Sequence, residues 1–295
     1  MSLFPEKSSI ESFAAPTDRF LNFVGEREAI RRRRVKGSPW PWTTDPILQN
    51  YRFCNVERER DRTTRDLVEL WFEPHRAEPD LWFASAVARQ VNWVPTLKEL
   101  GFPIPFNADQ FIDVMAVRRK RGEQIESAAY RIHADNSKGS AGVPKAVYIA
   151  NKVLKPLWAR RKVVRPKAGD WLEDFCNELK KFEAIDGFMA GQIIADVKYS
   201  EPLKGAPDWW TFASSGPGSR TGLNRVLGRK ADAPWSEPDW CREVGRLASV
   251  IAPGLKMLGL GRLHNQDLQN CLCEFARYEK LRLGEGTGRR YFGKG

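Results

Sequence analysis

Four polar side chains near the end of the sequence have a spacing that places them on one face of a helix. At about 100° per residue they form one narrow stripe, and a stripe of apolar residues runs beside it. Two acids, an amide and a phenol stacked in this way could form the acid–base wall of an active site. A solvent-exposed helix face has the same composition, so both interpretations stay open here. The stripe consists of Asp267, Asn270, Glu274 and Tyr278.

A second group of polar residues lies in the N-terminal part of the sequence. If this stretch is helical, Asn55, Arg58 and Arg62 fall on one face, and Asp61 is available to hold a guanidinium group in position. Arginines held in this way suit a phosphate or pyrophosphate leaving group. Alternating basic and acidic residues are also typical of an exposed, salt-bridged helix.

One glycine, Gly187, joins two helical patterns in residues 181–190. The pattern has the shape of a helix-hairpin-helix, with a tight turn and then the small Ala190 where the helices cross. Such a turn offers backbone N–H groups to a DNA phosphate. No cofactor or metal is expected, apart from a monovalent cation that the hairpin could hold. An ordinary pair of packed helices remains the alternative.

A loop rich in Gly and Pro follows about 20 residues after this hairpin and carries one acid, Asp208. The arrangement resembles the helix-hairpin-helix DNA glycosylases, in which a similar loop carries the catalytic aspartate, and Asp208 is the matching residue. Bifunctional members have a lysine just after the hairpin glycine, where this sequence has Phe188 and Met189. The resemblance therefore does not extend to lyase chemistry through a Schiff base.

A second glycine turn lies in residues 214–224 and contains Gly216 and Gly218. Its backbone amides could cradle a DNA phosphate, with Arg220 closing on it. The ending Gly-Lys-Ser/Thr of a Walker A loop is missing, so the turn does not predict a kinase. A simple turn at the start of a helix explains the local sequence equally well.

Several blocks of the sequence together resemble one family. Residues 26–30, 37–48 and 53–64 are similar to the signature of the α-glutamyl/putrescinyl thymine pyrophosphorylase family. This signature is shared with the helical domain attached to phage 5-hydroxymethyluracil DNA kinases. The resemblance continues at residues 187–196, 216–223 and 272–278, and it spans roughly residues 20–292.

This resemblance implies hypermodification of thymine bases in DNA. Members are thought to replace the phosphate or pyrophosphate of a modified 5-hydroxymethyluracil with an amine from an amino acid or a polyamine. The chain would then be a transferase acting on double-stranded DNA, coupled to a 5-hydroxymethyluracil DNA kinase. The two alternatives are a glycosylase that excises a modified pyrimidine and a DNA-binding module without catalysis.

The transferase hypothesis gives each candidate residue a role. Arg27 and Arg58, helped by Lys145 or Arg220, would neutralise the departing phosphate. Asp208 or Glu274 would accept the proton of the incoming amine. The flipped base would stack on a tryptophan such as Trp42. The remaining contacts are expected from Asn55, Asp45, Asp61, Asp267, Asn270 and Tyr278.

The charge balance supports a polyanionic partner. Among 295 residues, 48 Lys and Arg face 37 Asp and Glu, which is a net charge of +11. Basic side chains neutralise phosphates and release counterions, although a net charge also serves solubility. The residues expected along the DNA backbone, besides the turns at Gly187, Gly216 and Gly218, are Arg31, Arg32, Arg33, Arg34, Arg119 and Lys120.

The elements that must position these residues are helices. Apolar residues recur at helical spacing through most of the sequence, and only residues 128–133 resemble a short strand. We therefore expect an all-α, helix-hairpin-helix DNA-glycosylase-like bundle in two lobes. After a flexible arm (1–17), a single catalytic unit follows (18–295). It comprises an N-terminal lobe (18–165), a hairpin lobe (166–262) and a C-terminal helix (263–281) that returns to the first lobe.

Other classes of protein are not indicated. No apolar run approaches the ~20 residues of a membrane span, and the N-terminus lacks the pattern of a signal peptide. The five cysteines are scattered, which argues against a disulfide framework and against a zinc site. We expect a cytoplasmic monomer, in the host cytoplasm if the gene is carried by a phage.

Overall fold

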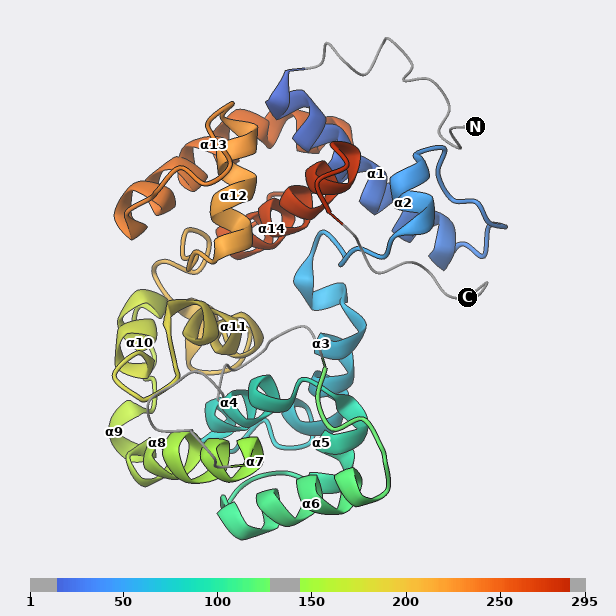
Figure 1. Cartoon of the computed structure of the whole chain (residues 1–295). Coiled ribbons are helices and arrows are strands. Elements are labelled where there is room, and N and C mark those ends of the chain that lie inside the picture. The colour runs from blue at the N-terminus through green and yellow to red at the C-terminus, as the bar shows by residue number, and fades with distance from the viewer. Residues whose placement is uncertain (1–14, 128–143, 287–295) are drawn as a thin grey trace. The chain divides into compact units, whose positions relative to one another are not determined.

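The computed structural model describes residues 15–127 and 144–286, and every regular element in these ranges is a helix (Figure 1). This confirms the predicted all-α class. The strand pattern at residues 128–133 lies outside the described ranges. Of the predicted arm, residues 1–14 also lie outside them, and the first helix begins at Pro16.

The chain divides into two compact units. Unit 1 consists of the residues up to Arg58 together with those from Ser215 onward, and unit 2 consists of Glu59–Ser214. The predicted lobe boundaries at residues 165/166 and 262/263 do not coincide with this division. The chain rejoins unit 1 at residue 215, well before its last helix. The two helices that precede the last one also pack against the first helix, so they belong to unit 1 as well.

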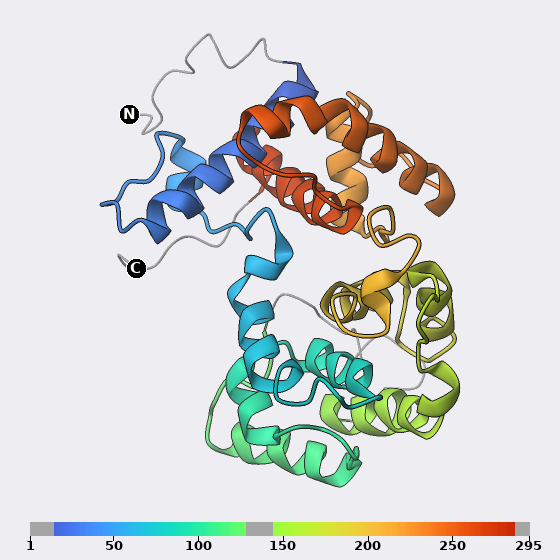
Figure 2. The same cartoon turned by 180° about the vertical axis from the view of Figure 1, so that it is seen from behind.

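Unit 1 is a bundle in which the two ends of the described chain meet. Its last three helices, orange to red in Figure 1, lie beside the blue first helix, and Figure 2 shows the same arrangement from behind. Phe20, Phe23 and Phe275 form the aromatic centre, with ring centroids 5.3 Å and 5.6 Å apart. The helices are α1 (Pro16–Val35), α2 (Pro46–Asn50), α12 (Pro217–Val226), α13 (Glu237–Met257) and α14 (Asn265–Arg282).

Local signals explain where these helices begin. Prolines occupy the first turns of α1, α2, α12 and α13, where their missing N–H leaves no helix bond unmade. The side chain of Asp45 accepts hydrogen bonds from two backbone N–H groups at the start of α2, as is typical of an Asp that precedes a proline at the first helical position. Ser236 and His264 cap α13 and α14 in the same way.

Two glycines bring α12 and α14 very close together. A Cβ atom on Gly222 would lie only 2.0 Å from the carbonyl oxygen of Leu272, and one on Gly218 would lie 2.5 Å from Sγ of Cys273. Only glycine allows the backbones to approach in this way. Gly218 therefore has a packing role against α14, and its role in a DNA cradle stays a prediction. Gly216 is the N-cap of α12, where its N–H donates to Ser219 Oγ.

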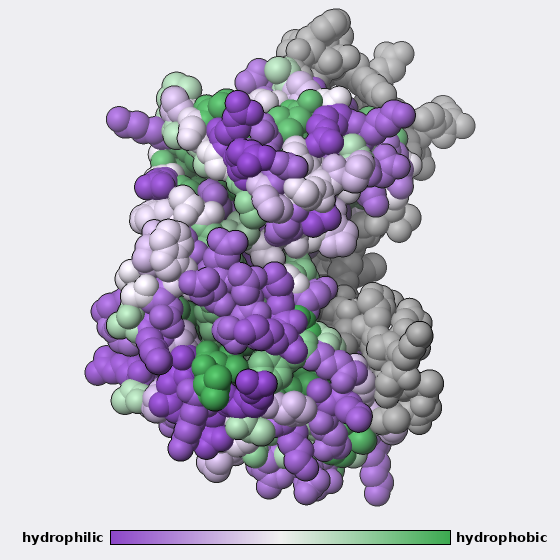
Figure 3. Space-filling model, turned by 90° about the vertical axis from the view of Figure 1, so that its left-hand side faces the viewer, coloured by the Kyte–Doolittle hydropathy of each residue, from purple (hydrophilic) through white to green (hydrophobic). Residues whose placement is uncertain are grey.

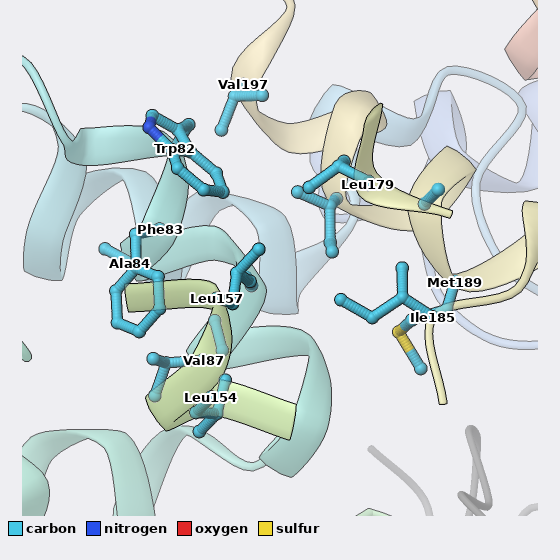
Figure 4. Packing of buried hydrophobic residues seen from close by; sticks show 14 of the residues in the cluster. Trp82, Phe83, Ala84, Val87, Leu154, Leu157, Leu179, Ile185, Met189 and Val197 are labelled. Carbon is cyan, nitrogen blue, oxygen red and sulfur yellow. The ribbon is translucent and has the colours of Figure 1, made fainter. Parts of the chain in front are cut away.

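Unit 2 is an array of shorter helices around one apolar core. In Figure 4, Trp82, Phe83 and Val87 lie beside Leu154 and Leu157, and Leu179, Ile185 and Met189 gather across from them. The helices are η1 (Arg58–Arg60, which begins at the last residue of unit 1), α3 (Arg62–Leu67), η2 (Val68–Phe72), α4 (Leu81–Val91), α5 (Val94–Leu100), α6 (Ala108–Lys120), α7 (Lys145–Tyr148), η3 (Ile149–Leu154), α8 (Lys155–Ala159), α9 (Arg161–Val164), α10 (Leu172–Leu179), α11 (Gly187–Val197) and η4 (Leu203–Gly205).

Apolar residues recur at helical spacing through residues 80–100, but this stretch forms two helices. Asn92 ends α4 in the left-handed conformation, with φ of 48°, and Pro95 lies in the first turn of α5. A buried ion pair joins α4 to α11: Arg89 Nε donates to Asp196 Oδ2 at 2.6 Å, and Ser85 Oγ donates to the same oxygen at 2.8 Å. The pair fixes the register of the two helices.

The predicted hairpin corresponds to α10, a connection at residues 180–186, and α11. Gly187 is the first residue of α11, and the left-handed residue of the connection is Ala184, with φ of 59°. Asp186 caps the helix by accepting from the N–H of Met189 at 2.8 Å. The carbonyl of Gly187 accepts from Ser214 Oγ at 2.7 Å, so this glycine has a packing role within unit 2.

One face of the described surface is mainly hydrophilic. On the face shown in Figure 3, purple hydrophilic residues predominate and hydrophobic residues form small green patches. Among the described helices, none combines the length and the apolar content that crossing a membrane requires.

Candidate active site in unit 1

A cluster of polar side chains surrounds the middle of α14 in unit 1. We call it the α14 cluster and define it as Arg27, Asn55, Arg58, Asp267, Asn270 and Glu274. Arg27 comes from α1, Asn55 and Arg58 come from the segment after α2, and the others come from α14. The structure thus brings together two of the motifs singled out in the sequence, which lie about 200 residues apart. All six belong to unit 1.

Arg27 lies in the middle of this cluster. Its guanidinium donates from Nε to the carbonyl oxygen of Cys54 at 3.0 Å, and from Nη2 to that of Asn55 at 2.8 Å. The side chain is 5% exposed, and Nη1 is buried without a hydrogen-bond partner among the described residues. A buried donor without a partner is uncommon in folded proteins and marks a place where an anionic group could bind.

The electrostatic surroundings keep Arg27 charged. Burial disfavours the guanidinium ion, but the nearby Cys271, Glu274 and Cys54 outweigh this and raise the pKa of Arg27 above its usual value. Glu274 is itself nearly buried, at 9% exposed, and its Oε2 lies 2.9 Å from Nη2 of Arg277. That oxygen is poorly oriented for a hydrogen bond and has no other partner among the described residues. The cluster therefore holds a fixed positive charge beside a carboxylate.

The two cysteines of α14 are part of the same surroundings. Burial raises the pKa of Cys271 to about 11, and burial together with Glu274 raises that of Cys273 to about 11. Both thiols stay protonated near neutral pH, so neither is an activated nucleophile. Cys54 is exposed, and its contribution to the cluster is its backbone carbonyl group.

Asp267 and Asn270 hold the segment that carries Asn55 and Arg58. Oδ1 of Asp267 accepts from the backbone N–H of Arg58 at 3.0 Å, and Nδ2 of Asn270 donates to the carbonyl of Asn55 at 3.4 Å. Oδ2 of Asp267 lies 3.0 Å from Nε2 of His264. Asp267 and Asn270 thus position the chain around Arg58, whose side chain is 7% exposed.

The fourth residue of the stripe lies one turn further along α14. The hydroxyl group of Tyr278 donates to Oδ2 of Asp45 at 2.7 Å, and the other oxygen of Asp45 caps α2. Trp42 is half-buried, its indole N–H donates to the carbonyl of Ser38, and the guanidinium of Arg34 lies 5.1 Å from its ring centroid. The stripe predicted on α14 therefore faces Asp45 at the start of α2 and the segment that carries Asn55 and Arg58, and it is not a solvent-exposed face.

Three candidate residues belong to unit 2 and have other contacts. Both carboxylate oxygens of Asp208 accept backbone N–H groups, from Leu172 at 2.8 Å and from Glu173 at 3.0 Å, so Asp208 caps the start of α10. Lys145 forms an ion pair with Glu126 at 2.6 Å. Asp61 is the residue before α3, and the turn at 58–60 does not continue the helical face predicted from Asn55 to Arg62.

Arg220 also has a defined partner. Its Nη2 lies 2.9 Å from Oε2 of Glu237, and its Nε donates to Ser215 Oγ at 2.7 Å. The backbone N–H of Ser215 donates to the other oxygen of Glu237 at 2.7 Å. This network fastens the start of α12 to the start of α13. Since the guanidinium is paired, the predicted closure of Arg220 over a phosphate would require breaking that pair.

The arginine run at the end of α1 is only partly available to DNA. Arg31 donates to both oxygens of Glu28 at 2.7 Å, and Arg32 donates to Glu28 at 2.9 Å and to the carbonyl of Gly259 at 2.7 Å. Burial opposes ionisation of Glu28, but these hydrogen bonds lower its pKa. Arg33 contacts Glu26 and the carbonyl of Trp42. In unit 2, Arg119 and Lys120 are exposed and have no ion-pair partner among the described residues.

A comparison with known families shows which family the chain belongs to. The family described as "5-hmdU DNA kinase, helical domain" matches residues 15–288. The chain belongs to this family. The match spans both units, so the α14 cluster and the unit 2 core both lie within this helical domain.

One curated relative has a longer chain. This chain is 24% identical over 227 residues to "5-hmdU DNA kinase" of Bacillus phage SP10. The alignment covers 70% of this chain and 35% of the relative. The chain therefore corresponds to about a third of that relative's length. No solved structure matches it.

Sequence reasoning missed some of the groups that form the site. The carbonyl oxygens of Cys54 and Asn55 are the main partners of Arg27, and no residue pattern predicts which carbonyl groups will face a buried guanidinium. Nδ1 of His264 accepts from the backbone N–H of Asp267, so His264 has a structural role as the cap of α14. Among the described residues there is no group of three or more His, Cys, Asp or Glu side chains that could hold a metal ion.

Proposed function

We propose that the chain takes part in the hypermodification of thymidine in phage DNA, as an amine transferase. It would act on DNA in which the 5-hydroxymethyl group of uracil carries a phosphate or a pyrophosphate. Membership of the 5-hmdU DNA kinase helical-domain family supports the pathway. The observation that carries the chemistry is the α14 cluster, in which Nη1 of buried Arg27 has no hydrogen-bond partner among the described residues and the charge of Glu274 helps to raise the pKa of Arg27.

The reaction needs one cationic group and one base. The amine nitrogen attacks the 5-methylene carbon, a C–N bond forms, and the C–O bond to the phosphate group breaks. Arg27 and Arg58 would stabilise the negative charge that develops on the departing phosphate. A carboxylate would accept the proton that the amine nitrogen loses. Glu274 is the stronger candidate for this base, because both oxygens of Asp208 are engaged at the start of α10.

Access to the base requires DNA distortion. The 5-methylene group of a stacked base is not reachable by a buried carboxylate, so the nucleotide would leave the duplex before reaction. The exposed side chains of Lys120 and Arg34 would contact the DNA backbone. Trp42 would stack on the extruded base. The partners of the protein would be the modified DNA, an amine donor and, in the pathway, a 5-hmdU DNA kinase.

The test measures the product directly. DNA containing 5-hydroxymethyluracil is phosphorylated enzymatically and incubated with the protein and a pool of amino acids and polyamines, and the nucleosides are then weighed by mass spectrometry. A transferase releases phosphate or pyrophosphate and yields a heavier nucleoside. Free base with abasic DNA would instead indicate a glycosylase, and salt-dependent binding without any change in mass would indicate a DNA-binding module.

A matched pair of variants tests the role of Glu274. Glu274→Gln removes the base with little change in shape, and we expect turnover to fall by at least about a hundredfold. Glu243→Gln on α13, which breaks only a surface ion pair with Arg246, is the control and should keep normal turnover. Full turnover of Glu274→Gln would refute the assignment of the base, and unchanged DNA mass with the wild-type protein would refute the transferase.

A further inference from the structure

Unit 2 contains a cavity that the proposed chemistry of the α14 cluster does not use. Its volume is about 240 Å³, and it lies between α4, α6 and the helix formed by α7 and η3. Val91, Phe111, Met115 and Ile149 form much of its wall. Pockets for drug-sized ligands usually measure about 300–1,000 Å³, so this cavity suits a smaller molecule.

An unpartnered amide group marks the cavity as a binding site. Gln90 lines it, is 2% exposed, and has no hydrogen-bond partner for either Oε1 or Nε2 among the described residues. Buried side-chain amides in folded proteins are almost always hydrogen-bonded. A ligand that offers a donor and an acceptor close together would satisfy both atoms at once.

Charges of both signs line the same cavity. Lys145 and Arg119 are basic, and Glu126 and Glu123 are acidic. Nζ of Lys145 lies 2.6 Å from Oε1 of Glu126, while Arg119 has no ion-pair partner among the described residues. Glu123 also pairs with Arg118 at 2.9 Å. The mixture favours a small zwitterion, because such a molecule presents an anion to the basic side chains and a cation to the acidic ones.

We propose that this cavity binds a free α-amino acid. The ammonium and carboxylate groups of an α-amino acid are attached to the same carbon atom and lie close together. The amide oxygen of Gln90 can therefore accept a hydrogen bond from the ammonium group while the amide nitrogen donates one to the carboxylate. Arg119 and Lys145 face the carboxylate, Glu126 faces the ammonium, and the apolar wall contacts the side chain. The inference goes beyond the proposed function, because the cavity lies in unit 2 and shares no residue with the α14 cluster.

Other small ligands fit the cavity less well. A polyamine has no acidic group to pair with Arg119. A phosphorylated nucleotide has no cation, and its phosphate would meet two carboxylates in addition to the two basic side chains. The neutral imide edge of a pyrimidine would satisfy Gln90 but would leave the charged groups of the cavity without a function.

The test measures binding in the absence of DNA. The full chain is titrated by calorimetry with each of the twenty amino acids, and with putrescine and thymidine monophosphate as competing probes. We expect one amino acid or a few related ones to bind, and neither probe. Binding should weaken at least tenfold in Gln90→Met and in Lys145→Met, while Gln110→Met and Lys162→Met, whose side chains do not line the cavity, should bind normally.

The same variants separate a binding role from a structural one. Removing an unpaired buried amide should leave the melting temperature of Gln90→Met unchanged or raised, so a loss of binding without a loss of stability supports the inference. Absence of amino-acid binding by the wild-type chain, binding of either probe instead, or unaltered binding in both variants would each overturn it.

The two proposals can fail separately. If amino acids bind through Gln90 but the modified DNA gains no mass, the cavity is a site and the transferase is refuted. If the transfer occurs and both Gln90→Met and Lys145→Met bind amino acids as the wild type does, the transferase stands and the cavity is not the binding site.

Discussion

Replacing Gly222 with alanine should force α12 and α14 apart. The added Cβ would lie 2.0 Å from the carbonyl oxygen of Leu272 and 2.6 Å from its carbonyl carbon, whereas ordinary contacts begin near 3.4 Å. The backbones must therefore separate by about 1.4 Å, the difference between 3.4 Å and 2.0 Å. Overpacking of a core usually costs about 1–3 kcal/mol. Because backbone atoms cannot rotate away, we expect a loss at the top of this range, about 3 kcal/mol.

Two other glycines give the matched controls. At Gly218 the obstacle is the thiol of Cys273, a side chain that can turn, so Gly218→Ala should cost about 1 kcal/mol, and Cys273→Ala should relieve much of that loss. Gly245 lies within α13 and has nothing within 4 Å of an added Cβ. Gly245→Ala should stabilise by about 0.4–1 kcal/mol, because it lowers the entropy of the unfolded chain.

The assay is urea unfolding followed by circular dichroism, with the midpoint and the slope recorded for each variant. Gly222→Ala should shift the midpoint most, and Cys273→Ala should not rescue it. A change below 1 kcal/mol for Gly222→Ala, or rescue by Cys273→Ala, would refute the conclusion that α12 and α14 touch through their backbones at this glycine.

Three further predictions concern buried charges and thiols. Arg89→Met leaves the carboxylate of Asp196 buried without its ion pair, so we expect a loss of about 3–5 kcal/mol in urea unfolding, and a loss below 1 kcal/mol would contradict the pairing. Asp208→Asn should cost about 1–2 kcal/mol through the weakened cap of α10; lost turnover at unchanged stability would indicate instead that Asp208 is catalytic. The pKa of Cys271 and of Cys273 is raised to about 11 in the folded protein, from 9.0, so the folded state holds more protons between these values and its stability should fall as pH rises from 9 to 11. The double variant with alanine at both cysteines should show a flatter pH dependence, and an unchanged slope would argue against buried thiols.

Helical spacing predicted much of unit 1 correctly. The stripe from Asp267 to Tyr278 does face a single region, because side chains three or four positions apart on a helix point the same way. The cap at Asp45 was also predictable, since a carboxylate before a proline at the first helical position has few other uses. Both conclusions depend on residues close together in the sequence.

The interpretations that needed distant partners were less reliable. A glycine before a helix is consistent with a phosphate cradle, but the sequence does not show that α14 crosses α12 at Gly218 and Gly222. Asp208 has the spacing of a catalytic acid, yet its two oxygens meet the start of α10, a contact with residues 36 positions earlier. Charge runs were ambiguous for the same reason, as the contact of Arg32 with the carbonyl of Gly259 illustrates.

The order of the two units along the chain affects how the protein emerges from the ribosome. Unit 2 is continuous, whereas unit 1 needs both α1 and α14, and residues 59–214 are made between them. At about 5–20 residues per second, the apolar side chains of α1 wait on the order of ten seconds or more for their partners on α14. During that interval Phe20 and Phe23 are without the aromatic partner Phe275 that they have in the folded protein. Slow synthesis should therefore make nascent chains of this protein dependent on chaperones until the last helix is complete.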